Sequence, residues 1–283
     1  MSVLAILERT NSWIVLIAVC IGMILLALEK KKIRAIFLGI FCALSAFLAL
    51  KALDISYELR SGHENTHGTP AVLWIAMGMQ EGFCGPGTYN RYQQDVLEMV
   101  EFDRKAAADV AKQEIRNRLK VFRDNPEYGR EFFKIKIQSQ WVSPLFAMLH
   151  STGSFSEEDV ASDVVREIYF GKYHDTVYGF ADRYQSVVYI GFLGVVFQAY
   201  KKRRSSAFYI PLITIVGGFL FSIIWEAQSR YVFPYYMFMI MYAPMGLYFW
   251  AEMFICICRK IFDKYFKSNN KIEQMFAKRT KVW

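Results

Sequence analysis

The segment Trp225–Tyr236 gathers side chains that are suited to binding a phosphate group. Glu226 and Arg230 lie four residues apart, and Tyr231 follows directly. A guanidinium binds phosphate oxygens in a two-donor fork, and a tyrosine hydroxyl adds a further donor. The same residues also suit an interfacial aromatic belt with a Glu–Arg pair at a frayed helix end. We therefore expect Arg230, Glu226 and Tyr231 either to bind a lipid-linked phosphate or to anchor the segment at the membrane surface.

A second polar segment, residues 76–92, is rich in glycine and carries tyrosine and asparagine. Glycine permits backbone conformations with positive φ, and tyrosine and asparagine side chains commonly contact sugars. A tight loop packed on the membrane surface is the simpler interpretation, and a sugar or acceptor site is the functional one. The candidate residues for the sugar or acceptor site are Gly78, Gln80, Glu81, Tyr89, Asn90 and Tyr92.

The stretch His63-Glu64-Asn65-Thr66-His67 matches the letters of the zinc-protease motif. That chemistry requires both histidines on one face of a helix, one turn apart. Gly62 precedes the stretch, Gly68-Thr69-Pro70 follows it, and it contains few helix-favouring residues. We interpret it as a polar loop, and we expect neither a metal site nor a cofactor.

The elements that must position these residues are membrane spans. Apolar residues make up 54% of the 283-residue chain and are bunched into five long runs. Each run has about 15–23 residues, close to the ~20 that cross a ~30 Å hydrocarbon layer as a helix. This pattern excludes a soluble protein and predicts an all-α polytopic membrane protein with about five transmembrane helices. The runs are residues 13–28, 35–50, 186–200, 207–224 and 236–258.

The positive charge lies only in segments that alternate spans place on one side of the membrane. Residues 29–34, 201–204 and 259–283 carry net charges of +3, +4 and +6, whereas residues 51–185 carry −4. Lys and Arg are retained on the cytoplasmic side of membrane proteins. We therefore expect the three basic segments inside and residues 51–185 outside. The same distribution argues against a nucleic-acid partner.

This topology divides the chain into four parts. Residues 1–50 form two transmembrane helices with the N-terminus outside, and residues 51–185 form an extracytoplasmic helical domain. Residues 186–258 form three transmembrane helices, and residues 259–283 form a basic cytoplasmic tail. A first span with an outside N-terminus is typical of the middle of a longer polytopic chain. We therefore expect the sequence to be the C-terminal part of a larger protein.

Capping residues predict the helices of the extracytoplasmic domain. Asp103 and Asn125 are favoured N-cap types, and Pro126 suits a first helical turn. Ser156 is followed by three acidic residues, which favour a helix start. The expected helices cover about residues 103–123, 126–141 and 156–171, with residues 61–92 irregular.

Several motifs, in order, resemble a known group of bacterial membrane proteins. The group is of the protein-mannosyltransferase and lipid A aminoarabinose transferase type (the GT-C superfamily, near family 39). Thr88 and Arg91 stand where the group usually has Trp and the second Gly of Gly-Trp-Tyr-Asn-Gly-Tyr. The motif residues are Thr69-Pro70, Trp74–Gly82, Gly87–Tyr92, Asn125-Pro126, Phe132-Phe133, Lys136, Ser139–Trp141, Glu226, Ser229–Tyr231 and Pro234-Tyr235.

The resemblance implies the C-terminal part of a polyprenyl-phosphate-sugar-dependent glycosyltransferase of cell-envelope glycan assembly in a bacterial plasma membrane. Its implied partners are membrane lipid, a lipid-linked sugar donor, and an N-terminal half or another membrane subunit. Arg230 and Glu226 are then expected at the carrier phosphate, with residues 78–92 near the sugar or acceptor. GT-C enzymes carry their catalytic acid in the first outer loop, which has no counterpart here, so no catalytic residue is assigned.

Two other functions are compatible with the topology. A non-catalytic integral membrane component of a glycan polymerase or export system shares the predicted spans and requires no catalytic acid. A transporter is the second alternative. Transport sites usually place ionisable residues inside the spans, and Glu252 is the exception in spans that otherwise carry almost none.

Overall fold

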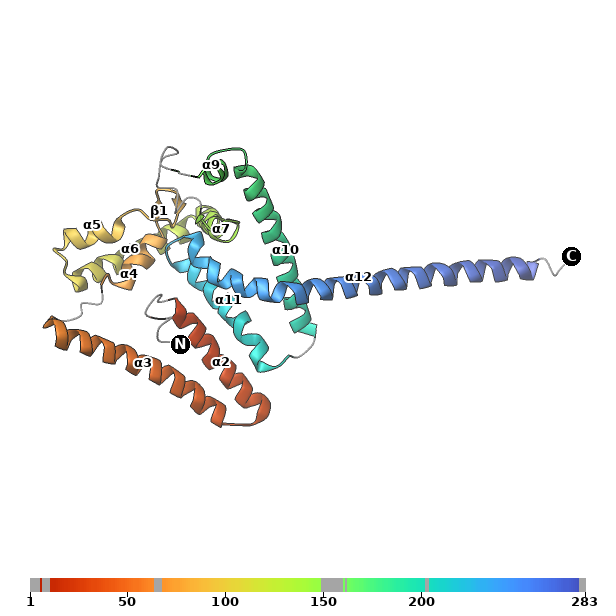
Figure 1. The fold of residues 1–283 in the computed structure, drawn as a ribbon, viewed down its shortest axis with the longest axis horizontal. Coiled ribbons are helices and arrows are strands. Elements are labelled where there is room, and N and C mark those ends of the chain that lie inside the picture. Colours follow the sequence, from red (N-terminus) through yellow and green to blue (C-terminus); the bar gives the residue numbers. More distant parts are fainter. Residues whose placement is uncertain are drawn as a thin grey trace. The chain divides into compact units, whose positions relative to one another are not determined.

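The computed structural model describes residues 6, 11–63, 68–148, 160, 162–201 and 204–279, with side chains up to 262 and at 264. Nearly all of the described chain is helical, which confirms the all-α fold (Figure 1). The elements are α2 (Ser12–Lys30), α3 (Arg34–Ser61), α4 (Ala71–Gly78), β1 (Glu81–Gly82), β2 (Gly85–Pro86), α5 (Tyr92–Met99), α6 (Arg104–Asp124), α7 (Pro126–Trp141), α9 (Asp163–Tyr169), α10 (His174–Lys201), α11 (Ser206–Ile224) and α12 (Ser229–Arg279).

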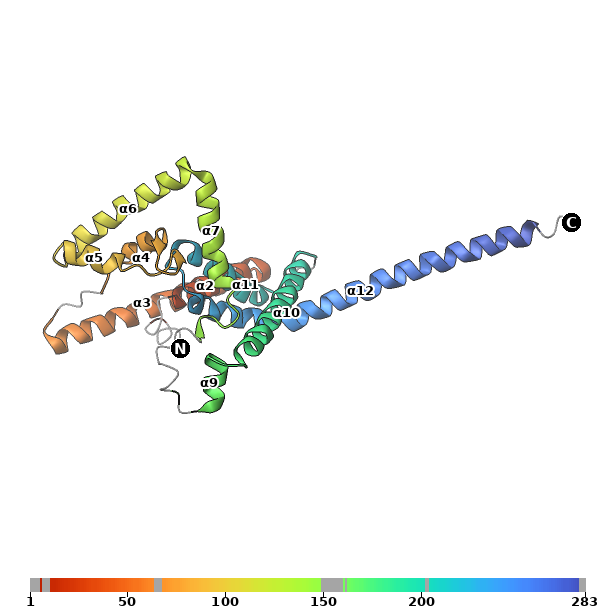
Figure 2. The ribbon, with the colours of Figure 1, turned by 90° about the horizontal axis from the view of Figure 1, so that it is seen from above.

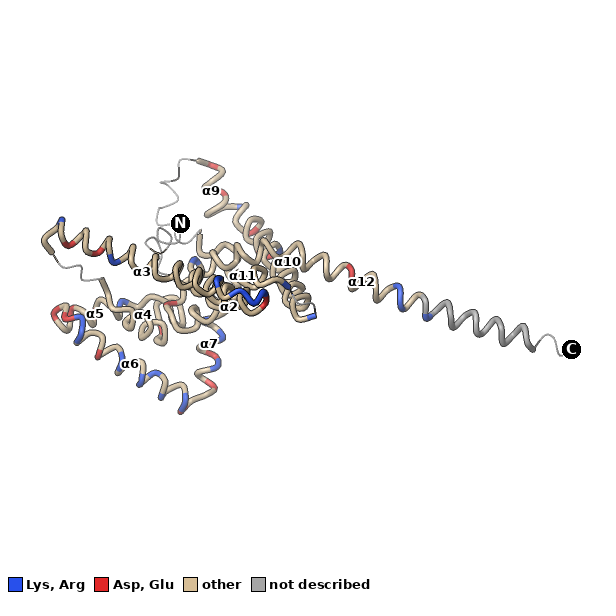
Figure 3. The backbone as a smooth tube through the Cα atoms, turned by 90° about the horizontal axis from the view of Figure 1, so that it is seen from below, with Lys and Arg blue, Asp and Glu red and all other residues tan. Residues whose placement is uncertain are grey.

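Four helices of the described chain are long and apolar enough to cross a membrane. They are α2, α3, α11 and residues Ser229–Phe262 of α12. The fifth predicted run, residues 186–200, lies within α10, which is long enough but not among the four. The run has only 15 residues, and Gln185 and Lys201 flank it directly. The charge distribution agrees with membrane spans, because the interiors of α2 and α11 carry no Lys, Arg, Asp or Glu (Figure 3).

Helix α3 continues well beyond its apolar run. The run ends near residue 50, but the helix extends through Lys51 and Asp54 to Ser61 because no helix breaker intervenes. Gly62 then ends the helix in the left-handed conformation, with φ of 72°, and its N–H donates to the carbonyl of Glu58. This is the usual helix-terminating role of glycine.

The chain divides into two compact units. The first comprises Met1–Tyr184 and Arg204–Phe238, and the second comprises Gln185–Arg203 and Met239–Trp283. In the first unit, α2 packs against both α3 and α11. The carboxylate of Glu29 accepts hydrogen bonds from the backbone N–H (3.1 Å) and the hydroxyl (2.5 Å) of Ser206, and so caps the start of α11.

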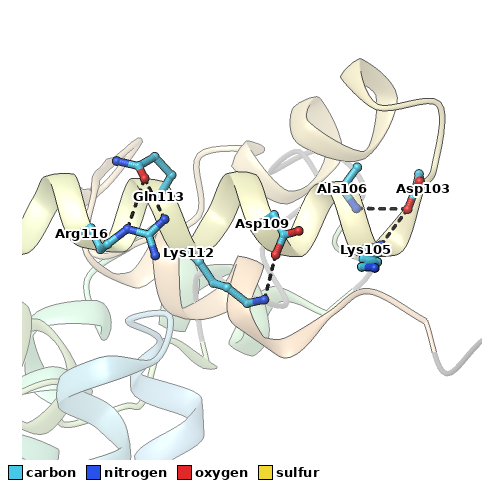
Figure 4. A network of polar contacts seen from close by, with 7 residues as sticks. All are labelled: Asp103, Lys105, Ala106, Asp109, Lys112, Gln113 and Arg116. Atoms are coloured by element: carbon cyan, nitrogen blue, oxygen red, sulfur yellow. Dashed lines mark hydrogen bonds and ion pairs between the residues drawn. The ribbon is translucent and has the colours of Figure 1, made fainter.

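The polar helices of the first unit begin as the sequence predicts. The Asp103 carboxylate accepts from the N–H groups of Lys105 (2.8 Å) and Ala106 (3.0 Å) at the start of α6 (Figure 4). The Asn125 side chain accepts from the Tyr128 N–H (3.2 Å) and caps α7, which starts at Pro126. Figure 2 shows α7 following α6 at a sharp bend, so that the two helices form a V.

Two expectations for this region are corrected or incomplete. Residues 61–92 are not irregular throughout, because Ala71–Gly78 form helix α4, and Glu81–Gly82 pair with Gly85–Pro86 as an antiparallel hairpin. Helix α4 forms because its eight residues are apolar and share a core with α5 and α6, built on Leu73 and Ala107. The predicted start of the third helix, Ser156–Asp159, lies outside the described residues, and the observed helix α9 covers Asp163–Tyr169.

In the second unit, small residues bring α10 and α12 into close contact. A side chain on Gly191 would collide with Ala243, and one on Gly194 would collide with Gly246. The indole N–H of Trp250 donates to the carbonyl of Ile190 (2.9 Å) across the same contact. Close approach through small residues is typical of helices that pack inside a membrane.

Candidate functional site

The turn between α11 and α12 meets the end of α4 and the β1–β2 loop. A Cβ atom on Gly78 would lie 2.6 Å from the carbonyl oxygen of Trp225, so only glycine permits this approach. The Ala227 N–H donates to the Gly87 carbonyl (2.7 Å). The rings of Trp74 and Trp225 stack with centroids 6.4 Å apart. The structure therefore brings together the two segments that the sequence singles out.

Glu226 is buried in this turn, with 3% of its surface exposed. Its carboxylate accepts hydrogen bonds from the Tyr231 hydroxyl (3.2 Å) and the Gln228 amide (3.4 Å). Burial raises the pKa of Glu226, and these hydrogen bonds and the charge of Arg230 oppose the rise. Glu226 precedes the start of α12, so it does not form the helical i, i+4 pair with Arg230 that the spacing predicts.

Arg230 is exposed in the first turn of α12. Its guanidinium carbon lies 5.5 Å from the centroid of the Tyr231 ring, close enough for a cation–π contact. Because the hydroxyl of Tyr231 reaches Glu226, the three side chains form a connected series. The cation faces outward and the carboxylate faces inward.

Lys136 is a buried cation of the site to which the sequence analysis assigns no role. It is completely buried, and its Nζ donates to the carbonyl of Gly78. Its methylene groups lie against Gly87, where a Cβ would come within 2.7 Å of the lysine Cε. Burial lowers the pKa of Lys136 to about 7. Helical spacing in the sequence could have indicated that Lys136 is buried, because Gly129, Phe132 and Lys136 lie on the same buried face of α7.

Gln140, one turn after Lys136, connects α7 to α11. Its amide nitrogen donates to the carbonyls of Lys136 and Ser222, each at 3.1 Å. The indole N–H of Trp141 donates to the Ser222 hydroxyl (3.0 Å). A narrow pocket lies beside this junction, lined by residues that include Gln140, Glu226 and Tyr235.

The polar side chains of the 78–92 loop mostly bond to one another. The Gln80 amide donates to the Glu114 carboxylate (2.8 Å) and accepts from the Asn90 amide (2.9 Å). The Tyr89 hydroxyl donates to Gln94 (3.1 Å). This bonding agrees with a tight, internally fixed loop and leaves little of Gln80 and Asn90 for a ligand.

The remaining loop candidates differ in exposure. Glu81 is exposed and accepts from the Tyr128 hydroxyl (2.8 Å), which in turn accepts from Arg118 (2.8 Å). Tyr92 packs against the core of α4 and α6, and burial together with the charge of Glu114 raises its pKa to about 12.

Arg91 adopts a backbone conformation that is unusual for a residue with a side chain. It has φ of 67°, a left-handed conformation that glycine adopts readily and other residues adopt at some cost. It occupies the N-cap position of α5.

The zinc-like stretch falls mostly outside the described residues, which include His63 but not Glu64–His67. The expectation of a polar loop stays a prediction there. Among the residues that the structure describes, no cluster of three or more metal-binding side chains is found.

Comparison with known proteins establishes the family. No curated protein and no solved structure matches the chain. A family described as conserved hypothetical integral membrane proteins matches residues 2–248, which is most of the sequence. The candidate spans agree with that description. The chain therefore belongs to this family of conserved hypothetical integral membrane proteins and is a multi-pass protein of the membrane.

Proposed function

We propose that the chain binds the phosphate of a lipid-linked sugar at Arg230, as the C-terminal part of a glycosyltransferase of bacterial cell-envelope glycan assembly. One observation carries the proposal: an exposed guanidinium at the end of a candidate span is connected through Tyr231 to the buried carboxylate of Glu226. Residues at the end of a span lie at the depth of lipid phosphates, and a guanidinium offers them two parallel donors.

The buried carboxylate favours phosphate binding over a simple aromatic anchor. Burying a carboxylate costs free energy unless hydrogen bonds compensate, and an interfacial belt of aromatic residues requires no such group. Here Glu226 orients Tyr231, and the Tyr231 ring lies beside the guanidinium of Arg230. Glu226 is therefore a positioning residue, and Arg230 makes the contact with phosphate.

In this proposal the 78–92 loop forms a wall next to the sugar or acceptor. Gly78 allows the loop to approach the turn, and Gln80 and Asn90 hold its shape. Among the loop candidates Glu81 is exposed, and Gln80, Tyr89, Asn90 and Tyr92 are partly exposed. Glu81 is therefore the loop residue best placed to touch a sugar or an acceptor.

A non-catalytic membrane component of a glycan polymerase or export system is the second candidate. The internal bonding of Gln80 and Asn90 favours it, because a loop whose polar groups are already paired serves as a scaffold. Such a component still allows Arg230 to contact lipid phosphate, but it does not transfer sugar.

The test is glycan transfer from a polyprenyl-phosphate sugar by the complete membrane assembly carrying Arg230→Lys or Arg230→Ala. The Lys variant keeps the charge and loses the two-donor fork, so both variants should transfer about ten- to a hundredfold more slowly. Glu226→Gln should give a smaller defect because it only loosens the tyrosine. The matched control is Arg116→Lys, an exposed arginine on α6 that bonds Gln113 (Figure 4).

Equal expression of every variant is checked through a tag. Transfer at the parental rate by both Arg230 variants would show that the phosphate role is wrong. The turn would then be a membrane anchor. An assembly that depends on the chain but transfers normally with Arg230→Ala would favour the non-catalytic component.

A further inference from the structure

Two residues that line the same pocket each carry a buried polar atom without a hydrogen-bond partner among the described residues. The two atoms are the Oε1 atom of Gln140 and the hydroxyl oxygen of Tyr235. Gln140 is 1% exposed and Tyr235 is 3% exposed, so solvent does not satisfy either atom. An unpaired buried polar group is costly and rare, and two on residues that line one pocket suggest a missing ligand group.

The orientation of the Gln140 amide is fixed by its neighbours. Its nitrogen donates to two backbone carbonyls, those of Lys136 and Ser222. Exchanging nitrogen and oxygen would place the amide oxygen against two acceptors, which is unfavourable. The unpaired atom is therefore the oxygen, and the pocket presents an acceptor at this point.

Tyr235 is held by its contact with α11. Its ring lies where a side chain at residue 218 would be, because a Cβ on Gly218 would come within 2.5 Å of the ring atoms. The ring is thereby seated against the helix, and its hydroxyl can donate to a ligand. Neither the pocket nor the ring position would survive a larger residue at Gly218.

A ligand group that pairs with both atoms must donate a hydrogen bond to the Gln140 oxygen and accept one from the Tyr235 hydroxyl. A hydroxyl group accepts from Tyr235 and donates to Gln140, whereas a metal cation cannot accept and a fully ionised phosphate cannot donate. The rings of Phe221 and Tyr235 add an aromatic wall, which suits the apolar face of a sugar ring. The pocket chemistry therefore matches an alcohol of a carbohydrate.

We propose that this pocket receives a hydroxyl group of the sugar that the lipid phosphate carries. The inference rests on the proposed function and identifies where the donor sugar is recognised. Glu226 and Tyr231, which connect to Arg230, also line the pocket, so the sugar site and the phosphate site are contiguous. The pocket has no room for a water molecule in this conformation, and its wall must move to admit the sugar.

The experiment compares binding of polyprenyl phosphate with and without an attached hexose, using glucose, mannose and galactose in turn. The purified full chain is held in nanodiscs. The parental protein should bind at least one glycosylated carrier about tenfold more tightly than the bare carrier. Tyr235→Phe should reduce that preference to less than about twofold and leave the affinity for the bare carrier unchanged. The control is Tyr236→Phe, the next tyrosine, which is equally buried but packs on Phe146 outside the pocket.

Thermal melting of the same variants provides a second readout. If the Tyr235 hydroxyl is unpaired without ligand, Tyr235→Phe should melt at or above the parental temperature. A lower melting temperature, or a preference for the sugar that survives Tyr235→Phe, would overturn the pocket proposal. Equal binding of bare and glycosylated carriers would overturn it alone, whereas failure of the bare carrier to bind would overturn the proposed function as well.

Discussion

The buried side chain of Lys136 contacts Gly78 and Gly87, and its helix α7 also contacts α11. Its Nζ bonds the end of α4 at Gly78, its methylene groups pack against Gly87, and its own helix is tied to α11 through Gln140. Among the described residues no carboxylate pairs with Lys136, and a buried lysine without such a partner is costly when charged. Desolvation accordingly lowers the pKa of Lys136 to about 7.

This pKa predicts a stability that rises with pH. The pKa is about 7 in the folded protein and about 10.5 in the unfolded chain. Between these values the unfolded chain binds a proton that the folded protein has released, so raising the pH favours folding. The contribution of this group to the free energy of unfolding should increase by about 2 kcal/mol from pH 7 to pH 9.

The comparison is between the parental protein and Lys136→Met, melted in detergent from pH 7 to pH 9. The parental melting temperature should rise more over this interval than that of the variant, which has no group to titrate at this position. Identical pH dependence in the two proteins would contradict a lowered pKa for Lys136.

Site residues that lie close together in the chain can be identified from the sequence, whereas contacts between distant segments cannot. Glu226, Arg230 and Tyr231 fall within six residues, so their neighbourhood is visible in the sequence. The contact of Lys136 with Gly78 joins two helices, and that of Gln80 with Glu114 joins a loop to α6. Composition and spacing carry no information about such contacts, and the sequence analysis could not predict them.

Local signals predict the helices where capping chemistry is strong. Asp103 and Asn125 begin α6 and α7 as expected because each side chain bonds a nearby backbone N–H. The sequence analysis does not predict helix α4, because the helix is short and glycine-rich segments follow it. Its stability comes from packing against α5 and α6, a tertiary effect that outweighs local preference.

The tight contact between α10 and α12 predicts a strong effect of side-chain size. Gly194→Leu should lower stability by about 1–3 kcal/mol because the added side chain collides with Gly246. Gly179→Leu is the matched control, since it lies on the same helix with open space around it. Melting temperature in detergent measures both changes.

The control should melt at or above the parental temperature because leucine favours helix over glycine. If Gly194→Leu melts like the control, α10 and α12 are not in close contact in the folded protein. A large difference would support α10 as a membrane helix, since close small-residue contacts suit that environment.

The native cysteine Cys84 can report which side of the membrane residues 51–185 occupy. Cys84 is exposed in the β1–β2 loop, within residues 51–185 that the charge distribution predicts outside. An impermeant thiol reagent should therefore label the parental protein in intact cells, and Cys84→Ser should abolish the labelling. Ser205, exposed before α11 and predicted inside, provides the opposite probe.

In the Cys84→Ser background, Ser205→Cys should react only after the cells are permeabilised. The reverse result, with Ser205→Cys labelled in intact cells and Cys84 protected, would invert the topology. It would also place Arg230 on the cytoplasmic side and remove the basis for an extracytoplasmic transfer reaction.

Affinity for polyprenyl phosphate decides whether Arg230 holds a lipid phosphate. The purified full chain in nanodiscs is titrated with polyprenyl phosphate and, for comparison, with polyprenol, which lacks the phosphate. The parental protein should prefer the phosphate, and Arg230→Lys should weaken that binding about ten- to a hundredfold while polyprenol binding stays the same. Equal affinity of the parental protein and Arg230→Lys for polyprenyl phosphate, or equal affinity of the parental protein for the two lipids, would contradict the proposal.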